Sequence, residues 1–209
     1  MQKNITLAAV KRAQKVIVLN DDMIALLKNF KDKLVKLPCG TDVEYFHEIP
    51  VEKKPQTYLI GFPGNKARKE KNHPLFIEIT DQLRSEFNIE IVEFHNLTRD
   101  EVVTNLNKID LLLMTSLVEG SPQIIKEAMA CNRAIISTSV GDVDYLLSGV
   151  TNSRVIKSFN AEDFIEPVKE ILRLPQAERR SNGRDQLHAI GLDADSVANS
   201  INKIYNELV

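Results

Sequence analysis

Short apolar runs alternate with longer segments of helical periodicity along most of the chain. The runs are rich in Ile, Leu and Val, which is typical of strands buried on both faces of a sheet. The predicted strands are 16–19, 34–37, 57–60, 89–94, 111–114, 134–138 and 155–156. The segments between them carry apolar residues at helical spacing, and the predicted helices are 23–30, 74–83, 98–106, 122–130, 143–147, 161–174 and 193–208.

Local signals support several of these boundaries. Thr98 precedes Glu101 by three residues, the spacing of a capping box at a helix start. Pro74 suits the first turn of a helix, and Gly61 is expected to end the strand before it. Strands that alternate with helices predict an α/β fold, a Rossmann-like parallel sheet with helices on both faces.

Sheets of this kind bind ligands beyond the carboxyl ends of their strands, where short loops lead into helices. This rule directs attention to the loops that follow Ile60, Phe94 and Met114. Composition narrows the ligand class. The net charge of -2 and an aromatic content of 6% without Trp do not favour nucleic acid.

Cysteine use and hydropathy bear on location. Cys39 and Cys131 lie far apart without metal-like spacing, as expected for reduced thiols in the cytosol. The apolar runs are too short to span a bilayer. A cytoplasmic location is expected, including a peripheral one at the inner membrane face.

The loop after Met114 carries the most specific chemistry. Gly120 allows a tight turn, and Ser121 and Pro122 suit the N-cap and first position of the next helix. Free N–H groups of that first turn form an anion site. Glu119 and Glu127 flank it, and two carboxylates can hold hydroxyl groups while the helix end holds phosphate. That combination suits a sugar nucleotide, although either glutamate alone is more often a surface charge.

The longer string around this loop resembles a known family. Residues 119–141 read EGSPQIIKEAMACNRAIISTSVG and are preceded by DLLLMTS. They resemble the donor-site signature of glycosyltransferase family four, retaining enzymes of the two-lobed GT-B fold. The resemblance implies that the amides of Gly120, Ser121 and Pro122 contact the donor's phosphate and sugar. It also implies that Glu127 holds the ribose, while Glu119 lies at the reacting face as the catalytic candidate.

The loop after Ile60 resembles the family's phosphate-binding segment. Its candidates for donor binding are Gly61, Asn65, Arg68 and Lys71, with Arg68 and Lys71 expected to neutralise the diphosphate. A solvated basic loop is the alternative interpretation.

Asn96 and Leu97, after the 89–94 strand, are the candidates for framing the base. The family's pattern is shortened by one strand and helix in this region, so these two assignments depend on the loop alone. His95 could border the base pocket, but a loop histidine without a ligand is the more common case.

The resemblance implies a division of the chain. Residues 1–54 would be a remnant of the first lobe and the interlobe linker, 55–192 the donor-binding domain and 193–209 a C-terminal helix. The implied activity is transfer of a hexose-type sugar from a nucleoside diphosphate sugar to a glycan or lipid-linked acceptor in polysaccharide biosynthesis. No metal or other cofactor is expected.

Several alternatives stay open at this point. The chain would need a first lobe for activity, supplied by a partner chain or replaced by self-association, and alone it is expected to be inactive. A nucleotide-sugar epimerase of the same fold and a non-catalytic nucleotide-sugar-binding module are the rival functions.

Overall fold

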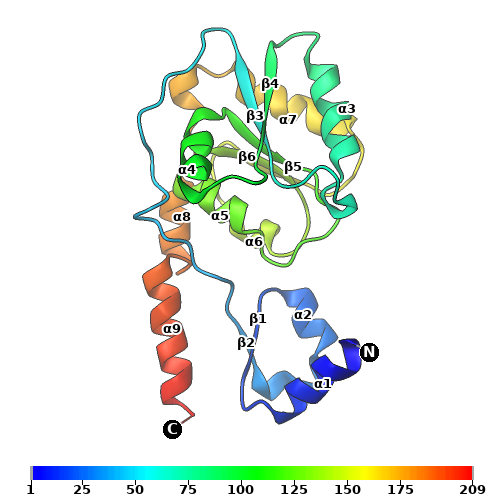
Figure 1. The fold of residues 1–209 in the computed structure, drawn as a ribbon, viewed down its shortest axis with the longest axis vertical. Helices are drawn as coiled ribbons and strands as arrows, with labels where there is room; N and C mark the ends of the chain where they lie inside the picture. Colours follow the sequence, from blue (N-terminus) through cyan, green and yellow to red (C-terminus); the bar gives the residue numbers. More distant parts are fainter. Residues whose placement is uncertain (1, 209) are drawn as a thin grey trace.

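The computed structural model describes residues 2–208, which form an N-terminal body and a larger main body (Figure 1). The N-terminal body consists of α1 (Gln2–Arg12), β1 (Val16–Val18), α2 (Asp21–Leu26), a 3-10 helix (Lys28–Lys33) and β2 (Leu34–Lys36). Its two strands pair with each other in parallel and form a sheet of their own. The two predicted strands of this region are therefore confirmed, each one residue shorter.

The main body is built on a five-stranded parallel sheet in the order β4-β3-β5-β6-β7. Its strands are β3 (Tyr58–Phe62), β4 (Ile89–Glu93), β5 (Leu111–Met114), β6 (Ala134–Thr138) and β7 (Ser153–Ile156). Its α-helices are α3 (His73–Leu83), α4 (Arg99–Lys108), α5 (Gln123–Ala130), α6 (Val143–Leu146), α7 (Glu162–Arg173), α8 (Gly183–Ala189) and α9 (Ala194–Asn206). Short 3-10 turns cover Lys69–Lys71 and Gln176–Glu178.

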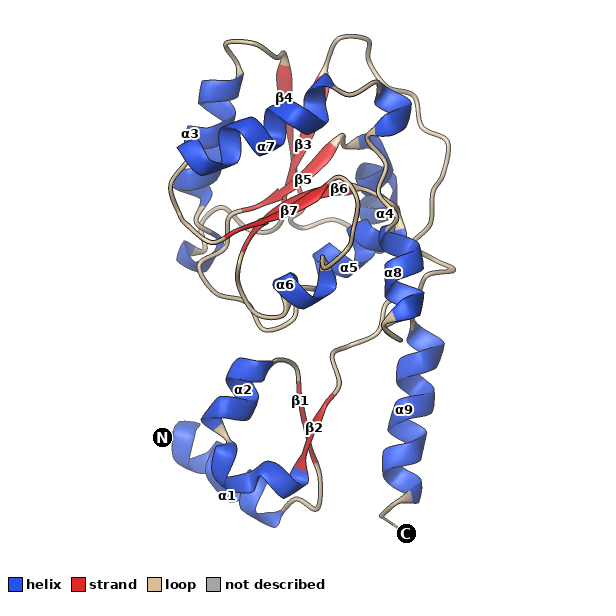
Figure 2. Ribbon diagram, turned by 180° about the vertical axis from the view of Figure 1, so that it is seen from behind, coloured by secondary structure: helices blue, strands red, loops and turns tan. Residues whose placement is uncertain are grey.

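Helices cover both faces of this sheet, as the alternating pattern predicts. In Figure 2, α3 and α7 lie on one face, and α4, α5, α6 and α8 lie on the other. Successive side chains of β5 point to opposite faces of the sheet. Leu111 and Leu113 pack with α3 and α7. Leu112 and Met114 pack with α5 on the other face. The α/β fold predicted from the sequence is confirmed.

Three sequence-based boundaries are wrong. Gly61 does not end its strand but lies inside β3, where a Cβ atom would come within 2.8 Å of the Phe94 ring. The helix predicted through Phe30 stops at Leu26, and the chain continues as a 3-10 helix. Ser121 does not cap α5, because the cap position falls one residue later at Pro122. The capping box of Thr98 and Glu101 is confirmed at the start of α4.

Two helices were not predicted, α1 and α8. The helix α8 begins at Gly183, a poor helix former, and only Gly183 and Leu187 are buried within it. The division of the chain at residues 54 and 192 stays a prediction.

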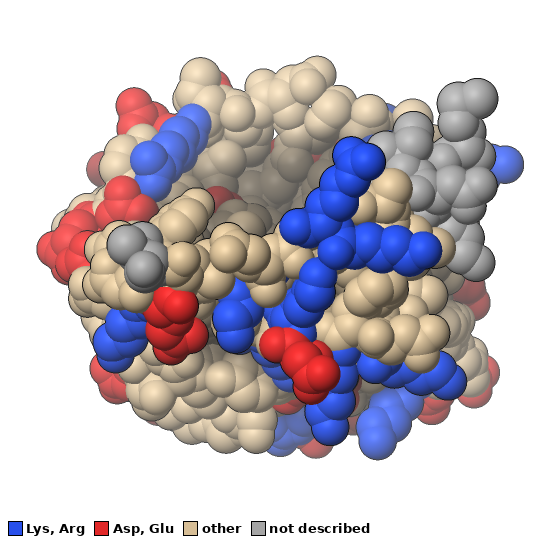
Figure 3. Space-filling model, turned by 90° about the horizontal axis from the view of Figure 1, so that it is seen from below, with Lys and Arg blue, Asp and Glu red and all other residues tan. Residues whose placement is uncertain are grey.

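The charge of the chain is unevenly distributed between the two bodies. Residues 6–36 hold seven Lys or Arg against three Asp, so the N-terminal body is basic although the whole chain is slightly acidic. Lys and Arg side chains gather over this body in the view from below (Figure 3).

One buried carboxylate joins distant parts of the main body. Asp110, just before β5, is only 3% exposed. Its Oδ2 accepts a hydrogen bond from the Leu59 backbone amide at 2.9 Å. Its Oδ1 accepts from Lys53 Nζ and from Arg179 Nη1, both at 2.9 Å. Asp110 therefore connects the linker, β3 and the segment after α7.

We expect Asp110→Ala to lower the free energy of unfolding by about 3–5 kcal/mol, because the change leaves two largely buried cations without their partner. Urea denaturation at neutral pH measures this difference. Asp81→Ala is the matched control, since Asp81 pairs with Arg84 on the exposed surface of α3 and such pairs contribute about 1 kcal/mol or less. Equal effects of the two substitutions would contradict the proposed role of Asp110.

Candidate functional site

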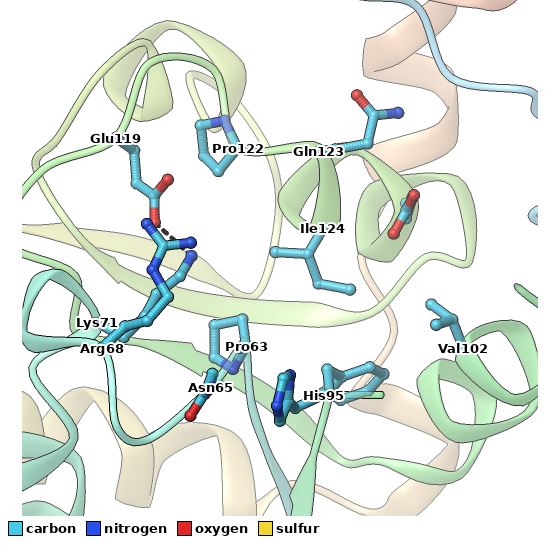
Figure 4. A pocket seen from close by; sticks show the side chains of 13 residues that line it. Pro63, Asn65, Arg68, Lys71, His95, Val102, Glu119, Pro122, Gln123 and Ile124 are labelled. Carbon is cyan, nitrogen blue, oxygen red and sulfur yellow. Dashed lines mark hydrogen bonds and ion pairs between the residues drawn. The ribbon is translucent and has the colours of Figure 1, made fainter. Parts of the chain in front are cut away.

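A pocket of about 480 Å³ opens at the carboxyl ends of β3, β4 and β5. Three loops and the first turns of two helices supply its walls (Figure 4). The lining residues are Pro63, Gly64, Asn65, Arg68 and Lys71 after β3, Phe94 and His95 after β4, Val102 of α4, and Glu119, Pro122, Gln123, Ile124 and Glu127 from the loop after β5 and from α5.

The pocket gathers many of the residues that the sequence singled out. Six candidates line it: Asn65, Arg68, Lys71, Glu119, Pro122 and Glu127. Five candidates do not: Gly61, Asn96, Leu97, Gly120 and Ser121. Gly61 is enclosed within the sheet, and Gly120 and Ser121 lie in the chain between Glu119 and Pro122, which do line the pocket.

The base-side candidates Asn96 and Leu97 are not among the residues that line the pocket, and their contact with a base stays a prediction. Asn96 adopts a left-handed conformation with φ of 55°. Phe94 and His95 line the wall instead. His95 was weighed from the sequence and set aside, whereas Phe94, Val102 and Ile124 were missed because their apolar side chains matched the pattern of a core.

Two of the candidates in the pocket, Lys71 and Glu119, form an ion pair with each other. Lys71 Nζ lies 2.7 Å from Glu119 Oε1, and the Ser116 hydroxyl donates to the same oxygen at 2.8 Å. Both charged side chains are mostly buried, at 15% and 17% exposure. The Lys71 chain lies across Gly64, where a Cβ would come within 2.9 Å of Lys71 Cε. Gly64 also has a φ of +122°, so this position favours glycine on two grounds.

Arg68 supplies a second, more exposed positive charge. Its side chain is 60% exposed and is 3.8 Å from Glu70, a distance that gives only a weak surface pair. In Figure 4 the guanidinium of Arg68 and the ammonium of Lys71 both lie toward Glu119. The arrangement places two cations and one carboxylate at one end of the pocket, beside the start of α5.

Glu127 lies one turn further along α5 than Gln123 and also lines the pocket. Burial raises the pKa of its carboxyl group, and the positive charges of Arg99 and Lys126 offset only part of this effect. Arg99 is held in place by the linker, because it stacks 3.9 Å over the Tyr45 ring and its Nη2 lies 3.0 Å from Asp42 Oδ2. The carboxylate of Glu127 is thus poorly solvated.

The loop from Glu119 to Pro122 is packed tightly from behind. Gly141, with φ of +62°, passes so close that a Cβ there would come within 2.5 Å of the Gly120 carbonyl oxygen. Lys126, fully buried, donates to Ser121 Oγ at 3.1 Å and to the Cys39 carbonyl oxygen at 2.7 Å. The N–H groups in the first turn of an α-helix have no acceptor one turn before them; in α5 the Ile125 amide donates to the Pro122 carbonyl oxygen at 3.2 Å, and Gln123 and Ile124 line the pocket. The pocket therefore combines an anion site with an apolar wall and two carboxylates.

Comparison with known proteins shows the family. The sequence profile of the family described as "Glycosyl transferases group 1" matches residues 69–174, just over half of the chain. The chain therefore belongs to the glycosyl transferases group 1. An uncharacterized glycosyltransferase of Methanocaldococcus jannaschii is 23% identical over 109 residues, which cover 52% of this chain and 31% of that protein.

Solved glycosyltransferase structures share the fold at low sequence identity. Sucrose-phosphate synthase from Thermosynechococcus elongatus has a TM-score of 0.77 at 16% identity, covering 96% of this chain and 60% of that one. HepE of Anabaena, solved in complex with UDP and glucose, has a TM-score of 0.73 at 12% identity, covering 98% and 67%. A glycosyltransferase from Rickettsia africae gives 0.72 at 16% identity, covering 93% and 63%.

These likenesses establish that the main body has the parallel sheet of GT-B glycosyltransferases. The chain spans about a third of the curated relative and 60% of the first of these structures. Among residues 2–208, no helix is long and apolar enough to cross a membrane.

The raised pKa of Glu127 predicts that its negative charge lowers the stability of the folded protein. A carboxyl group with a higher pKa when folded holds its proton more tightly in the folded state, so stability falls as pH rises through the window above the ordinary Glu value. We expect Glu127→Gln to raise the midpoint of thermal unfolding at pH 7, with a gain that shrinks toward pH 4. Glu78→Gln, on the exposed side of α3, is the control. A loss of stability in Glu127→Gln at pH 7 would contradict this account.

Proposed function

We propose that this chain is the donor-binding part of a retaining glycosyltransferase of family four, which takes a nucleoside diphosphate sugar without a metal ion. The observation that carries the proposal is the position of Glu119, Glu127 and Lys71 around one pocket at the carboxyl ends of parallel strands. The UDP bound to HepE of Anabaena, which shares the fold, supports a nucleotide as the ligand class.

Each part of the pocket matches one part of such a donor. Phe94, Val102 and Ile124 offer an apolar wall to a planar base, and Glu127 can accept hydrogen bonds from ribose hydroxyls. Arg68, Lys71 and the first turn of α5 supply positive charge for the diphosphate. Glu119 then lies next to the sugar, on the diphosphate side of the pocket.

The charged groups would act mainly on the leaving diphosphate. As the bond between the sugar and the diphosphate breaks, negative charge develops on the leaving oxygen, and cations already in place stabilise it. Lys71 reaches that position by exchanging its contact with Glu119 for a phosphate oxygen. The exchange frees the Glu119 carboxylate to accept hydrogen bonds from sugar hydroxyls.

The acceptor, a glycan or a lipid-linked sugar, would bind to a separate lobe. Holding an acceptor against the anomeric carbon can lower a barrier by about 7–11 kcal/mol, and this contribution requires a surface facing the pocket. The N-terminal body holds only two strands of three residues each. We therefore propose that transfer requires a first lobe, in the same protein or in a partner.

Calorimetric titration with UDP, GDP and ADP and with their sugar conjugates, in EDTA, tests the donor site. We expect one nucleoside diphosphate to bind in EDTA. Glu127→Ala should weaken binding by about 1.5–3 kcal/mol, roughly ten- to a hundredfold, because charge-assisted hydrogen bonds to the ribose are lost. Glu78→Ala serves as the control. No binding across the panel, or binding only with magnesium, would overturn the proposal.

Donor turnover tests the need for a first lobe. The chain alone is expected to release no sugar from the bound donor at an enzymatic rate, whereas a candidate first-lobe protein added in excess should restore transfer. Robust transfer by the chain alone would show that the acceptor site lies within these residues. Release of an epimerised free sugar would instead favour an epimerase.

A further inference from the structure

The loop that carries Glu119 is held by a residue of the N-terminal body. The side-chain amide of Asn20 donates to the Gly120 carbonyl oxygen at 2.8 Å, between residues that are 100 positions apart in the chain. Asn20 is only 4% exposed. The contact therefore joins the two bodies at the loop next to the pocket.

The orientation of Asn20 is fixed by a second hydrogen bond. Its Oδ1 accepts from the Met23 backbone amide at 2.9 Å and caps the start of α2. Because a backbone amide must face an oxygen, the NH2 group of Asn20 is the part that meets the Gly120 carbonyl. One side chain thus performs two separable tasks, capping α2 and holding the loop.

Apolar side chains of the N-terminal body lie close to this contact. A Cβ at Gly120 would lie 3.4 Å from Leu19 Cδ1 and 3.6 Å from Met23 Cε, so both side chains cover the loop at this point. The hydrogen bond is part-buried, and a typical intramolecular hydrogen bond contributes only modestly to global stability.

The Gly120 carbonyl determines the direction of the next amide. A trans peptide is planar, so its C=O and the following N–H point in opposite directions. When Asn20 holds the carbonyl, the N–H of Ser121 is directed away from the N-terminal body. Next to this peptide in the chain, Glu119 accepts a hydrogen bond from Lys71 and the Ser121 hydroxyl accepts one from Lys126.

We propose that Asn20 is a positioning residue for donor binding, which orients the Ser121 amide toward the donor's diphosphate through the Gly120 carbonyl. The inference rests on the proposed function, since the diphosphate is the group that the amide would meet. It adds that the N-terminal body contributes to donor affinity without touching the donor.

Coupling of this kind is reciprocal. If the contact with Asn20 favours donor binding, donor binding must favour the contact by the same factor. Hydrogen exchange in residues 16–26 should therefore slow when nucleoside diphosphate is added, although this segment does not line the pocket.

Two substitutions separate the tasks of Asn20. Asn20→Ser and Asn20→Asp both keep an oxygen that can cap α2, but neither holds the Gly120 carbonyl, because serine is too short and an ionised aspartate has no donor. We expect each variant to bind the nucleoside diphosphate selected by the titration panel about three- to tenfold more weakly. Binding of the matching nucleoside, measured by NMR titration, should not change.

Asp22→Ala is the matched control, because Asp22 lies exposed in the first turn of α2 without facing Gly120. It should leave both affinities and the donor-induced protection of residues 16–26 unchanged. In the two Asn20 variants that protection should be lost, while the midpoint of thermal unfolding stays close to that of the parent protein.

Three results would overturn the inference. Equal affinity for the diphosphate in Asn20→Ser and the parent protein would show that the contact has no part in binding. Parallel loss of nucleoside and diphosphate affinity, with a lower unfolding midpoint, would show a structural role alone. A parent protein that binds no nucleotide would overturn the proposed function and this inference together.

Discussion

The architecture depends on a carboxylate, Asp110, that is buried with all of its charge compensated. A buried charge is tolerated only when its hydrogen bonds are complete, and here the partners come from the linker, from β3 and from the segment after α7. These partners approach the end of β5 that lies opposite the pocket. The amino ends of the central strands are thereby fixed, and the loops at their carboxyl ends extend from a rigid frame.

The positive charges of the pocket at those loops are already partly compensated by carboxylates of the protein. Lys71 and Glu119 compensate each other, and Arg68 is held only weakly by Glu70. Under the proposed function, an incoming diphosphate would exchange an existing ion pair for a new one, so its net gain would be smaller than the charges alone suggest. Selectivity for a complete donor would follow, because a ligand with hydroxyl groups beside its phosphates gives Glu119 a partner in return.

Sequence reasoning predicted the sheet well because buried parallel strands produce apolar runs that cannot be mistaken for surface. It placed Asn65, Arg68, Lys71, Glu119 and Glu127 around one pocket, because loops at the carboxyl ends of parallel strands must converge. Sequence reasoning could not predict local features that depend on a single residue. No periodicity reveals that the chain turns at Asn96, nor that a side chain 100 positions away supports Gly120.

The two cysteines differ in exposure, so that one of them can be labelled selectively. Burial raises the pKa of the Cys131 thiol to about 12, so it carries almost no thiolate at neutral pH and is closed to reagents. Cys39 is exposed and lies where the chain passes from β2 into the main body. A maleimide dye will therefore attach at one point without mutagenesis. Its fluorescence will report on the segment between the two bodies in the unaltered sequence.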